Sequence, residues 1–231
     1  TQFLLYPWNA ILRSLNKVPF SMEDFTFNDF QNFVSKQTDF SELFIKMQDS
    51  GELSSELKDD GTPVTEIDLE IEISLRKAIE NQFPHHSIIG EEFSDKTKPS
   101  EFKWIIDPID GTFSLTKSVP LFGILVGFLE GSIPRFGCVR FPLLGNKLIY
   151  GDGEKTFEDG KLMHSSNETK LKDALILTSD ETRLKRSEYS DKWNKLNELV
   201  SYHRTWGDCY GYYLVCSGRA QAMIDVDMKP C

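Results

Sequence analysis

The sequence has 231 residues, 39% of them hydrophobic and 12% aromatic, so it can form a substantial core as one large domain or two small ones. Its net charge of −10 and isoelectric point near 5.0 argue against general binding to nucleic acids or membrane surfaces. Four cysteines without C-x-x-C spacing indicate the reduced thiols of a cytoplasmic protein, and no apolar run approaches the ~20 residues that span a bilayer.

The chain is expected to divide into an N-terminal arm, residues 1–20, and one domain over residues 21–231. Apolar residues of the arm fit one helical face, which predicts a short docked helix or a partly ordered arm. Residues 21–50 carry apolar side chains at helical spacing. We therefore expect two helices, the first starting near Ser21, with a break near Thr38.

A charged turn over residues 58–63 leads to Thr65, which is a good helix N-cap. Asp68 stands three residues later, where the partner of a capping box is found. Apolar spacing predicts that the helix continues through about Gln82.

Pro84 ends this helix, and His85 and His86 follow it. Paired histidines suggest zinc, but no third ligand stands at a convincing spacing. We therefore expect both histidines to be exposed to solvent.

Several short segments rich in β-branched and aromatic residues follow, with turns between them, and Gly160 marks a further tight turn. The first three predict an antiparallel meander, and a charged helix is expected over residues 183–199 with Trp193, Leu196 and Leu199 on its inner face. This mixture, without strict βαβ alternation, favours α+β layers. The predicted strands cover residues 122–129, 135–141, 147–150 and 175–178.

One stretch, residues 104–112, combines a buried strand with chemistry at its end. The apolar run from Trp104 stops at two carboxylates, Asp107 and Asp110, and Thr112 then opens a segment that can start a short helix. Carboxylates hold hard cations, and a helix N-terminus offers N–H groups to an anion. A metal-bound phosphate suits this arrangement, whereas a solvated surface turn is the alternative.

A second pair of acids, Glu91 and Glu92, follows another short apolar run that ends at Gly90. Two strands that each end in carboxylates place four acids at one edge of a sheet. Such a cluster repels itself, and a bound divalent cation removes the conflict.

Residues 88–92 and 104–112, in this order and at this separation, resemble the inositol monophosphatase superfamily of magnesium-dependent, lithium-sensitive phosphatases. The resemblance runs from about Lys58 to the last residue. It implies an α+β fold, a layered α-β-α-β-α sandwich, with two or three Mg²⁺ ions. It also implies hydrolysis of a small-molecule phosphate monoester by a metal-activated water, without a phosphoenzyme. Relatives are often dimers, so a homodimer is a further expectation.

The same resemblance implies the metal ligands. Carried over by position, Glu91 and Asp107 bind a first metal with the carbonyl of Ile109, and Asp107 and Asp110 bind a second. The family also carries an acid at Asp68 that lies near the metals, often through water. Helix capping is the alternative role of Asp68.

Roles in catalysis are implied in the same way. Glu91 and Thr112 position and deprotonate the attacking water, and Asp107 completes the catalytic set. The N–H groups of Gly111 and Thr112 hold phosphate oxygens. Lys58 matches a mobile loop that in the family helps to position metal and water.

The stretch from Arg204 to Tyr213 resembles the histidinol-phosphatase branch, in which an Arg-x-Trp-Gly-Asp-x-Tyr-Gly pattern helps to shape the substrate pocket. Arg204 and Asp208 are therefore expected to bind substrate, with Asp208 accepting a cationic amine or imidazolium of histidinol phosphate, in histidine biosynthesis. Asp208 as a helix cap is the alternative. Asp225 matches an acid on the leaving-group side. Inositol-1-monophosphatase and nucleotide 3′-phosphatase activities are the alternatives for the enzyme.

The sequence departs from the family pattern at its end. A further metal-binding Asp is expected directly after the pair that Pro230 and Cys231 match, where this sequence stops. The resemblance therefore predicts that the C-terminal part of the fold is incomplete in this sequence. A catalytically impaired binding protein of the same fold is the alternative outside the enzymes.

Overall fold

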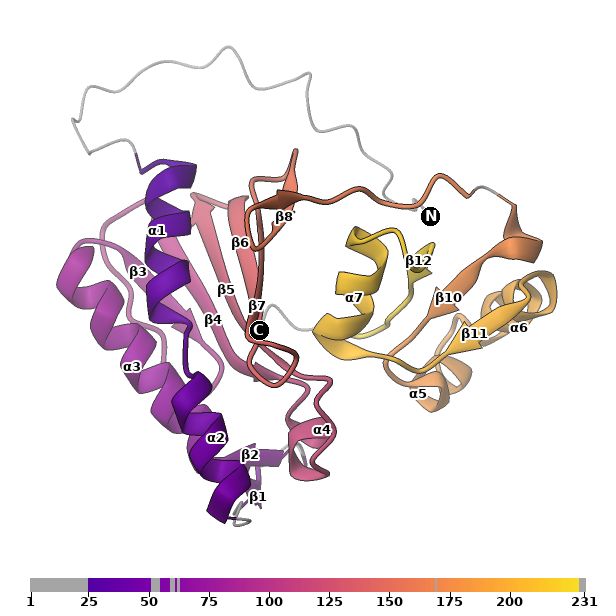
Figure 1. The fold of residues 1–231 in the computed structure, drawn as a ribbon, viewed down its shortest axis with the longest axis horizontal. Coiled ribbons are helices and arrows are strands. Elements are labelled where there is room, and N and C mark those ends of the chain that lie inside the picture. Colours follow the sequence, from indigo (N-terminus) through magenta and orange to yellow (C-terminus); the bar gives the residue numbers. More distant parts are fainter. Residues whose placement is uncertain (1–24, 51–54, 59–60, 62, 169, 229–231) are drawn as a thin grey trace.

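The computed structural model describes residues 25–50, 55–58, 61, 63–168 and 170–228, so the expected arm lies outside the described residues. Helices and sheets alternate in layers across the molecule (Figure 1). The α+β class and the layered α-β-α-β-α sandwich are therefore confirmed. No helix in the described part of the chain is long and apolar enough to cross a membrane.

The first layer holds helices α1 (Phe27–Gln37), α2 (Ser41–Ser50) and α3 (Glu66–Gln82). The predicted break near Thr38 is confirmed, because α1 ends there. The expected start at Ser21 lies outside the described residues, and Thr26 caps α1 instead. A hairpin of β1 (Ser55–Leu57) and β2 (Pro63–Thr65) precedes α3.

The second layer is a seven-stranded sheet in the order β3-β4-β5-β6-β7-β8-β9. Strands β3 and β4 run parallel, and every later pair is antiparallel, so the predicted meander over β5, β6 and β7 is confirmed. The strands are β3 (Ser87–Gly90), β4 (Phe102–Asp110), β5 (Gly123–Glu130), β6 (Ile133–Phe141), β7 (Lys147–Gly151), β8 (Thr156–Glu158) and β9 (Lys161–Leu162).

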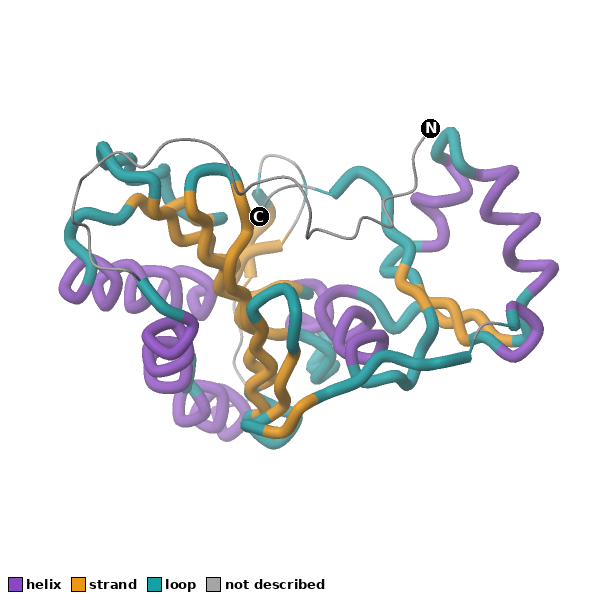
Figure 2. Tube along the Cα trace, turned by 90° about the horizontal axis from the view of Figure 1, so that it is seen from above, coloured by secondary structure: helices purple, strands orange, loops and turns teal. Residues whose placement is uncertain are grey.

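The main core fills the space between the first helices and this sheet. Phe30 of α1, Ile71 and Leu75 of α3, and Trp104 of β4 are fully buried there. Seen from above, α1 to α3 lie on one side of the strands and α7 (Asp208–Cys216) lies on the other (Figure 2). The acids at the strand ends are thus held on a rigid, well-packed support.

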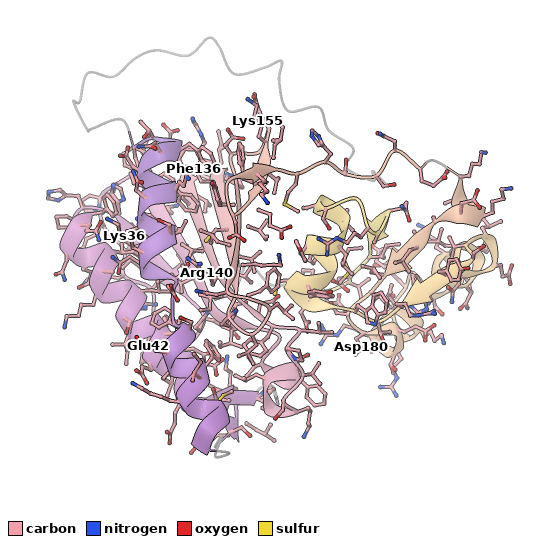
Figure 3. All side chains as sticks on the ribbon, in the orientation of Figure 1. Lys36, Glu42, Phe136, Arg140, Lys155 and Asp180 are labelled. Carbon is pink, nitrogen blue, oxygen red and sulfur yellow. The ribbon has the colours of Figure 1, made fainter. Side chains whose placement is uncertain are left out.

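Arg140 of β6 joins the end of α1 to the sheet, beside the junction of α1 and α2 (Figure 3). Its buried guanidinium donates to the carbonyl of Ser35 (2.8 Å), the hydroxyl of Thr38 (3.1 Å) and the carbonyl of Asn146 (3.0 Å). The bond to Ser35 satisfies a carbonyl group at the end of α1, and the bond to Asn146 ties that end to the turn after β6.

Helix α7 (Asp208–Cys216) is the middle layer between the two sheets (Figure 1). Cys209 and Tyr213 pack against Phe141 and Ile149 of the large sheet, and Leu214 packs against the small one. The small sheet is parallel, with β10 (Leu175–Leu177) between β11 (Tyr202–Arg204) and β12 (Ala222–Met223). The 3-10 turn η1 (Leu171–Asp173) precedes it.

The single helix predicted over residues 183–199 is wrong. The structure has two helices, α5 (Glu181–Arg186) and α6 (Ser190–Leu199), which form the outer layer. The break lies at Ser187, whose hydroxyl bonds the carbonyl of Leu184 (2.8 Å) and the N–H of Tyr189 (3.1 Å). Such local side-chain bonds compete with the helix. Of the predicted inner face, Trp193 is buried but Leu199 is 58% exposed.

The expected exposure of the paired histidines is correct for His85 and wrong for His86. The ring of His86 stacks on Phe83 (5.2 Å between centroids) and contacts Phe102 (5.0 Å). Its Nδ1 accepts the indole N–H of Trp104 (3.0 Å). His86 is therefore a hydrogen-bonded member of the core edge.

Candidate active site

Parallel pairing of β3 and β4 brings the two acidic motifs to one edge of the sheet. Gly90 stands opposite Ile106, so Glu91 and Asp107 are the next residues on neighbouring strands. Because the carboxyl ends of parallel strands meet at the same edge, both motifs face the same region. This placement is the one that the sequence predicted.

The end of β4 is irregular, which turns its acids out of the ladder. The register on β5 shifts between Asp107 and Asp110, where Pro108 has no N–H to donate. Gly111 follows with φ of +92°, a conformation that favours glycine, and caps the short helix α4 (Thr112–Thr116). The predicted short helix after Gly111 is confirmed.

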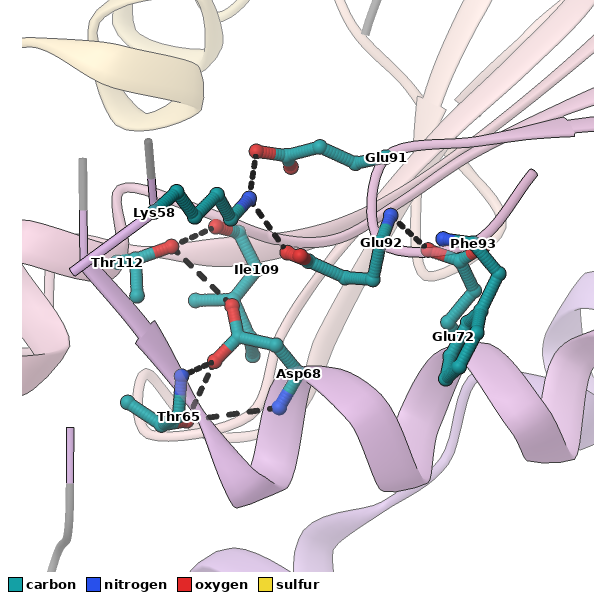
Figure 4. A network of polar contacts seen from close by, with 9 residues as sticks. All are labelled: Lys58, Thr65, Asp68, Glu72, Glu91, Glu92, Phe93, Ile109 and Thr112. Carbon is teal, nitrogen blue, oxygen red and sulfur yellow. Dashed lines mark hydrogen bonds and ion pairs between the residues drawn. The ribbon is translucent and has the colours of Figure 1, made fainter. Parts of the chain in front are cut away.

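Asp68 caps α3 and also contacts Thr112, at the end of the stretch 104–112 (Figure 4). It accepts the N–H of Thr65 (2.9 Å) and the hydroxyl of the same residue, which is the capping box expected at this helix start. Its other oxygen lies 3.2 Å from the hydroxyl of Thr112, which also reaches the carbonyl of Ile109 (2.8 Å). Asp68 and Thr112 are thus brought together from elements far apart in the chain.

Lys58 supplies a positive charge at this edge (Figure 4). Its ammonium bonds Glu91 (2.7 Å) and Glu92 (2.8 Å). Although burial opposes the effect, these two bonds raise the pKa of Lys58. The lysine therefore stays charged and holds both glutamates.

Glu72 and Arg76 support the glutamate turn from below, and the sequence analysis missed both. Glu72 is fully buried, accepts the N–H of Glu92 (2.8 Å) and pairs with Arg76 (2.7 Å). A Cβ at Gly90 would lie 2.0 Å from Glu72 Oε1, so glycine permits the approach. The detectable pattern was an acid four residues after Asp68, on the buried side of α3.

The acids of β4 are half-buried and face like charges. Burial, followed by the charges of Asp110 and Glu91, raises the pKa of Asp107 well above its usual range. Asp107 Oδ1 is buried without a hydrogen-bond partner among the described residues. Burial also raises the pKa of Asp110, although the backbone N–H of Cys209 donates to it. Each burial disfavours the ionised form.

These observations test whether the residues fit a cation. An orphaned buried carboxylate oxygen, clustered acids and a carbonyl form the all-oxygen set that Mg²⁺ prefers. In the parts that the structure describes, no three His, Cys, Asp or Glu side chains enclose a cation as they stand. The carboxylates of Glu91 and Glu92 bind the ammonium of Lys58. The donor chemistry therefore fits magnesium, with the ammonium as a neighbouring positive charge.

Helix α7 brings Asp208 to the same region. An ideal Cβ at Gly111 would lie 3.1 Å from Asp208 Oδ2, so the carboxylate closely approaches the turn after β4. The N-cap position of α7 is Gly207, and the carboxylate of Asp208 accepts no hydrogen bond from the described residues, which disfavours the capping alternative. Burial, with the charges of Asp110 and Asp225, raises the pKa of Asp208 to about 6.

Asp225 lies beside the end of β10. It accepts the N–H of Ser179 (2.8 Å), the hydroxyl of Ser179 (3.0 Å) and the hydroxyl of Tyr212 (3.2 Å). Neither Ser179 nor Tyr212 was among the predicted site residues. Ser179 directly follows the strand predicted over residues 175–178, which the structure shows to be parallel to its neighbours. The ends of parallel strands often bind ligands, so this position was a detectable signal once the strand direction was known.

Arg204 is not brought to the acids by any contact of the described residues. It is exposed in β11, and its guanidinium donates to the carbonyl of His203 (2.7 Å). Its expected substrate contact stays a prediction. Pro230 and Cys231 lie outside the described residues.

Comparisons with known proteins agree with the sequence motifs. The chain matches the model of the inositol monophosphatase family over residues 35–231. The histidinol-phosphatase of Chlorobaculum parvum is 34% identical over 170 residues, which are 73% of this chain and 65% of that protein. The chain spans 49% to 65% of the length of the first curated relatives that it matches.

Solved structures share the fold. The extragenic suppressor protein SuhB of Bartonella henselae has a TM-score of 0.75 at 19% identity, covering 83% of this chain and 76% of that chain. An IMPase/NADP phosphatase complexed with Mg²⁺ and phosphate has a TM-score of 0.67 at 24% identity, covering 84% of this chain and 72% of that chain.

Proposed function

Because the chain belongs to the inositol monophosphatase family, we propose that the full-length protein is a Mg²⁺-dependent phosphate monoester hydrolase that prefers histidinol phosphate. One observation carries this proposal. Buried acids with raised pKa values at the end of β4 lie beside the carboxylate of Asp208. The acids suit cations that bind phosphate, and Asp208 suits a cationic leaving group.

We assign the metal ligands to the acids of the two strands. Asp107, Asp110 and Glu91 would hold the cations with the carbonyl of Ile109, and Asp68 lies close enough to Thr112 to join through water. The cations supply positive charge that offsets the phosphate and the charge developing on the leaving oxygen.

The remaining chemistry belongs to the chain itself. The hydroxyl of Thr112, held between Asp68 and the carbonyl of Ile109, orients a water for attack on phosphorus. Glu91 accepts a proton from that water. The N–H groups of Gly111 and Thr112, at the start of α4, hold phosphate oxygens.

Substrate choice is assigned to the α7 side. Asp208 accepts the amine or imidazolium of histidinol phosphate, and Asp225 contributes on the leaving-group side. Arg204 stays a predicted substrate contact. The substrate is a small molecule, and a cytoplasmic homodimer is the assembly we expect.

The test is phosphate release from histidinol phosphate and from inositol 1-phosphate in parallel, with and without Mg²⁺, by the full-length protein. Asp208→Asn should lower the preference for histidinol phosphate about 10- to 100-fold, since a hydrogen bond to a charged group is lost. Asp191→Asn on exposed α6 is the matched control and should keep the preference. If the protein preferred inositol 1-phosphate, the proposed hydrolase activity would stand and the proposed substrate would be wrong. No Mg²⁺-dependent release would discard both.

A further inference from the structure

The hydroxyl of Ser179 stands between the two acids of the leaving-group side. It accepts the backbone N–H of Asp208 (2.9 Å) and lies 3.0 Å from Asp225 Oδ2. Since an N–H can only donate, the oxygen of Ser179 accepts there and its hydrogen points to the carboxylate. The direction of the whole chain of hydrogen bonds is therefore fixed, from Asp208 through Ser179 to Asp225.

Asp225 is committed to this arrangement. Its Oδ1 accepts the N–H of Ser179 (2.8 Å) and faces the hydroxyl of Thr178 (3.4 Å). Its Oδ2 accepts the hydroxyls of Ser179 and Tyr212. Both oxygens thus face donors of the protein, which leaves few acceptor positions for a substrate.

Asp208 shows the opposite pattern. Its backbone has φ of +53°, in the left-handed region that few residues other than glycine adopt. The backbone N–H of Asp208 donates to the hydroxyl of Ser179, and the next N–H, that of Cys209, donates to the carboxylate of Asp110. These two hydrogen bonds fix the conformation of Asp208. Among the described residues, Asp208 bonds Ser179 only through its backbone N–H, and its carboxylate accepts no hydrogen bond. Strained backbone with a free functional group is typical of a binding position.

Gly207 makes the contact between α7 and β10 possible. A Cβ at this position would lie 2.3 Å from the Cα of Ser179, closer than any real contact. Only glycine lets the start of α7 approach Ser179 closely enough for the bond to Asp208.

We propose that Ser179 and Asp225 are positioning residues that hold the free carboxylate of Asp208 toward a positively charged alcohol leaving group. Asp225 acts on Asp208 through Ser179. This inference rests on the proposed function and deepens it, because it divides the two acids between recognition and support.

The test is a double-mutant cycle between Ser179→Ala and Asp208→Asn, read as the ratio of kcat/KM for histidinol phosphate to that for inositol 1-phosphate. Ser179→Ala should lower this ratio about tenfold, through KM more than kcat, because one hydrogen bond that fixes Asp208 is lost. Added to Asp208→Asn, it should change the ratio little further, because it acts through that carboxylate. Ser187→Ala, the same substitution between α5 and α6, is the matched control and should keep the ratio.

Additive effects of the two substitutions, or an equal loss with both substrates, would overturn the inference. If the preference for histidinol phosphate depended on Asp208 but Ser179→Ala left it unchanged, the inference would also be overturned. The proposed function would then still stand. Calorimetry of histidinol binding, with Mg²⁺ and inorganic phosphate present, separates the two proposals. Histidinol binding that Ser179→Ala weakens supports the inference even if no ester is hydrolysed, whereas absence of binding and of hydrolysis overturns both.

Discussion

The two ends of strand β4 differ in whether their buried polar groups have hydrogen-bond partners. At one end Trp104 packs against Phe25 (5.5 Å between centroids) and donates its indole N–H to His86 (3.0 Å). At the other end Asp107 and Asp110 are half-buried among like charges, and the buried Oδ1 of Asp107 has no partner among the described residues. Only two residues, Ile105 and Ile106, separate the tryptophan from the first acid.

A single cause acts at both ends. Burial lowers the pKa of His86 to about 4 and raises the pKa of Asp107, since it disfavours the charged form in each case. At His86 the protein satisfies the neutral ring with a hydrogen bond. At Asp107 it leaves an acceptor that none of the described residues satisfies, and an acceptor of this kind suits a cation. One end of the strand therefore contributes stability and the other contributes chemistry.

The largest expected effect comes from removing the charge at the acidic end. Asp107→Asn should lower kcat at least about 10³-fold, because the amide is a poorer ligand for the cations that offset the phosphate charge. The free energy of unfolding without metal should stay the same or rise, because one of several like charges is gone. Phosphate release and urea unfolding of the same preparation measure both quantities.

Asp173→Asn, on the exposed turn η1, is the control for this substitution. A rate near that of the wild type for Asp107→Asn would mean that the metal assignment is wrong. A large loss of stability would mean that Asp107 belongs with the structural end of the strand.

The aromatic end should show the converse. Trp104→Ala should lower the free energy of unfolding by about 3–5 kcal/mol, since it opens a cavity in a fully buried site and leaves His86 without its donor. Urea unfolding measures this loss. Trp206→Ala, at a side chain that is 44% exposed, should cost much less. Equal losses for the two tryptophans would remove the distinction between the ends of β4.

Local patterns predicted much of the fold and of the acidic site. Thr65 and Asp68 are three residues apart, so their capping box follows from sequence. Glu91 and Asp107 follow two short apolar strands, and the parallel pairing of those strands then brings them together. The family resemblance added the layer order, which periodicity alone does not determine.

Several of the missed features depend on contacts between distant segments. Ser179 meets Asp225 across 46 residues, and the guanidinium of Arg140 meets Thr38 across 102. No spacing rule connects such pairs, because only the packed layers bring them together. His86 was assigned to solvent for the same reason, since a loop position next to Pro84 carries no local indication of the rings that cover it.

The smallest expected effect concerns His86, and it tests the contrast between the two ends of β4. Its folded pKa of about 4 lies below the ordinary 6.5, so between these values the unfolded state binds the proton first. The stability from the buried neutral ring is therefore complete above about pH 6.5 and is lost as the pH falls toward 4. A single group changes the slope by at most about 1.4 kcal/mol per pH unit.

Urea unfolding between pH 4 and pH 7 should show this slope in the wild type and a flatter one in His86→Gln, which cannot take up the proton. His85→Gln is the matched control, because His85 is exposed beside it, and this variant should keep the slope. If His86→Gln and His85→Gln gave parallel curves, His86 would not be neutral in the folded protein. The aromatic end would then hold a buried charge as the acidic end does, and the contrast along β4 would disappear.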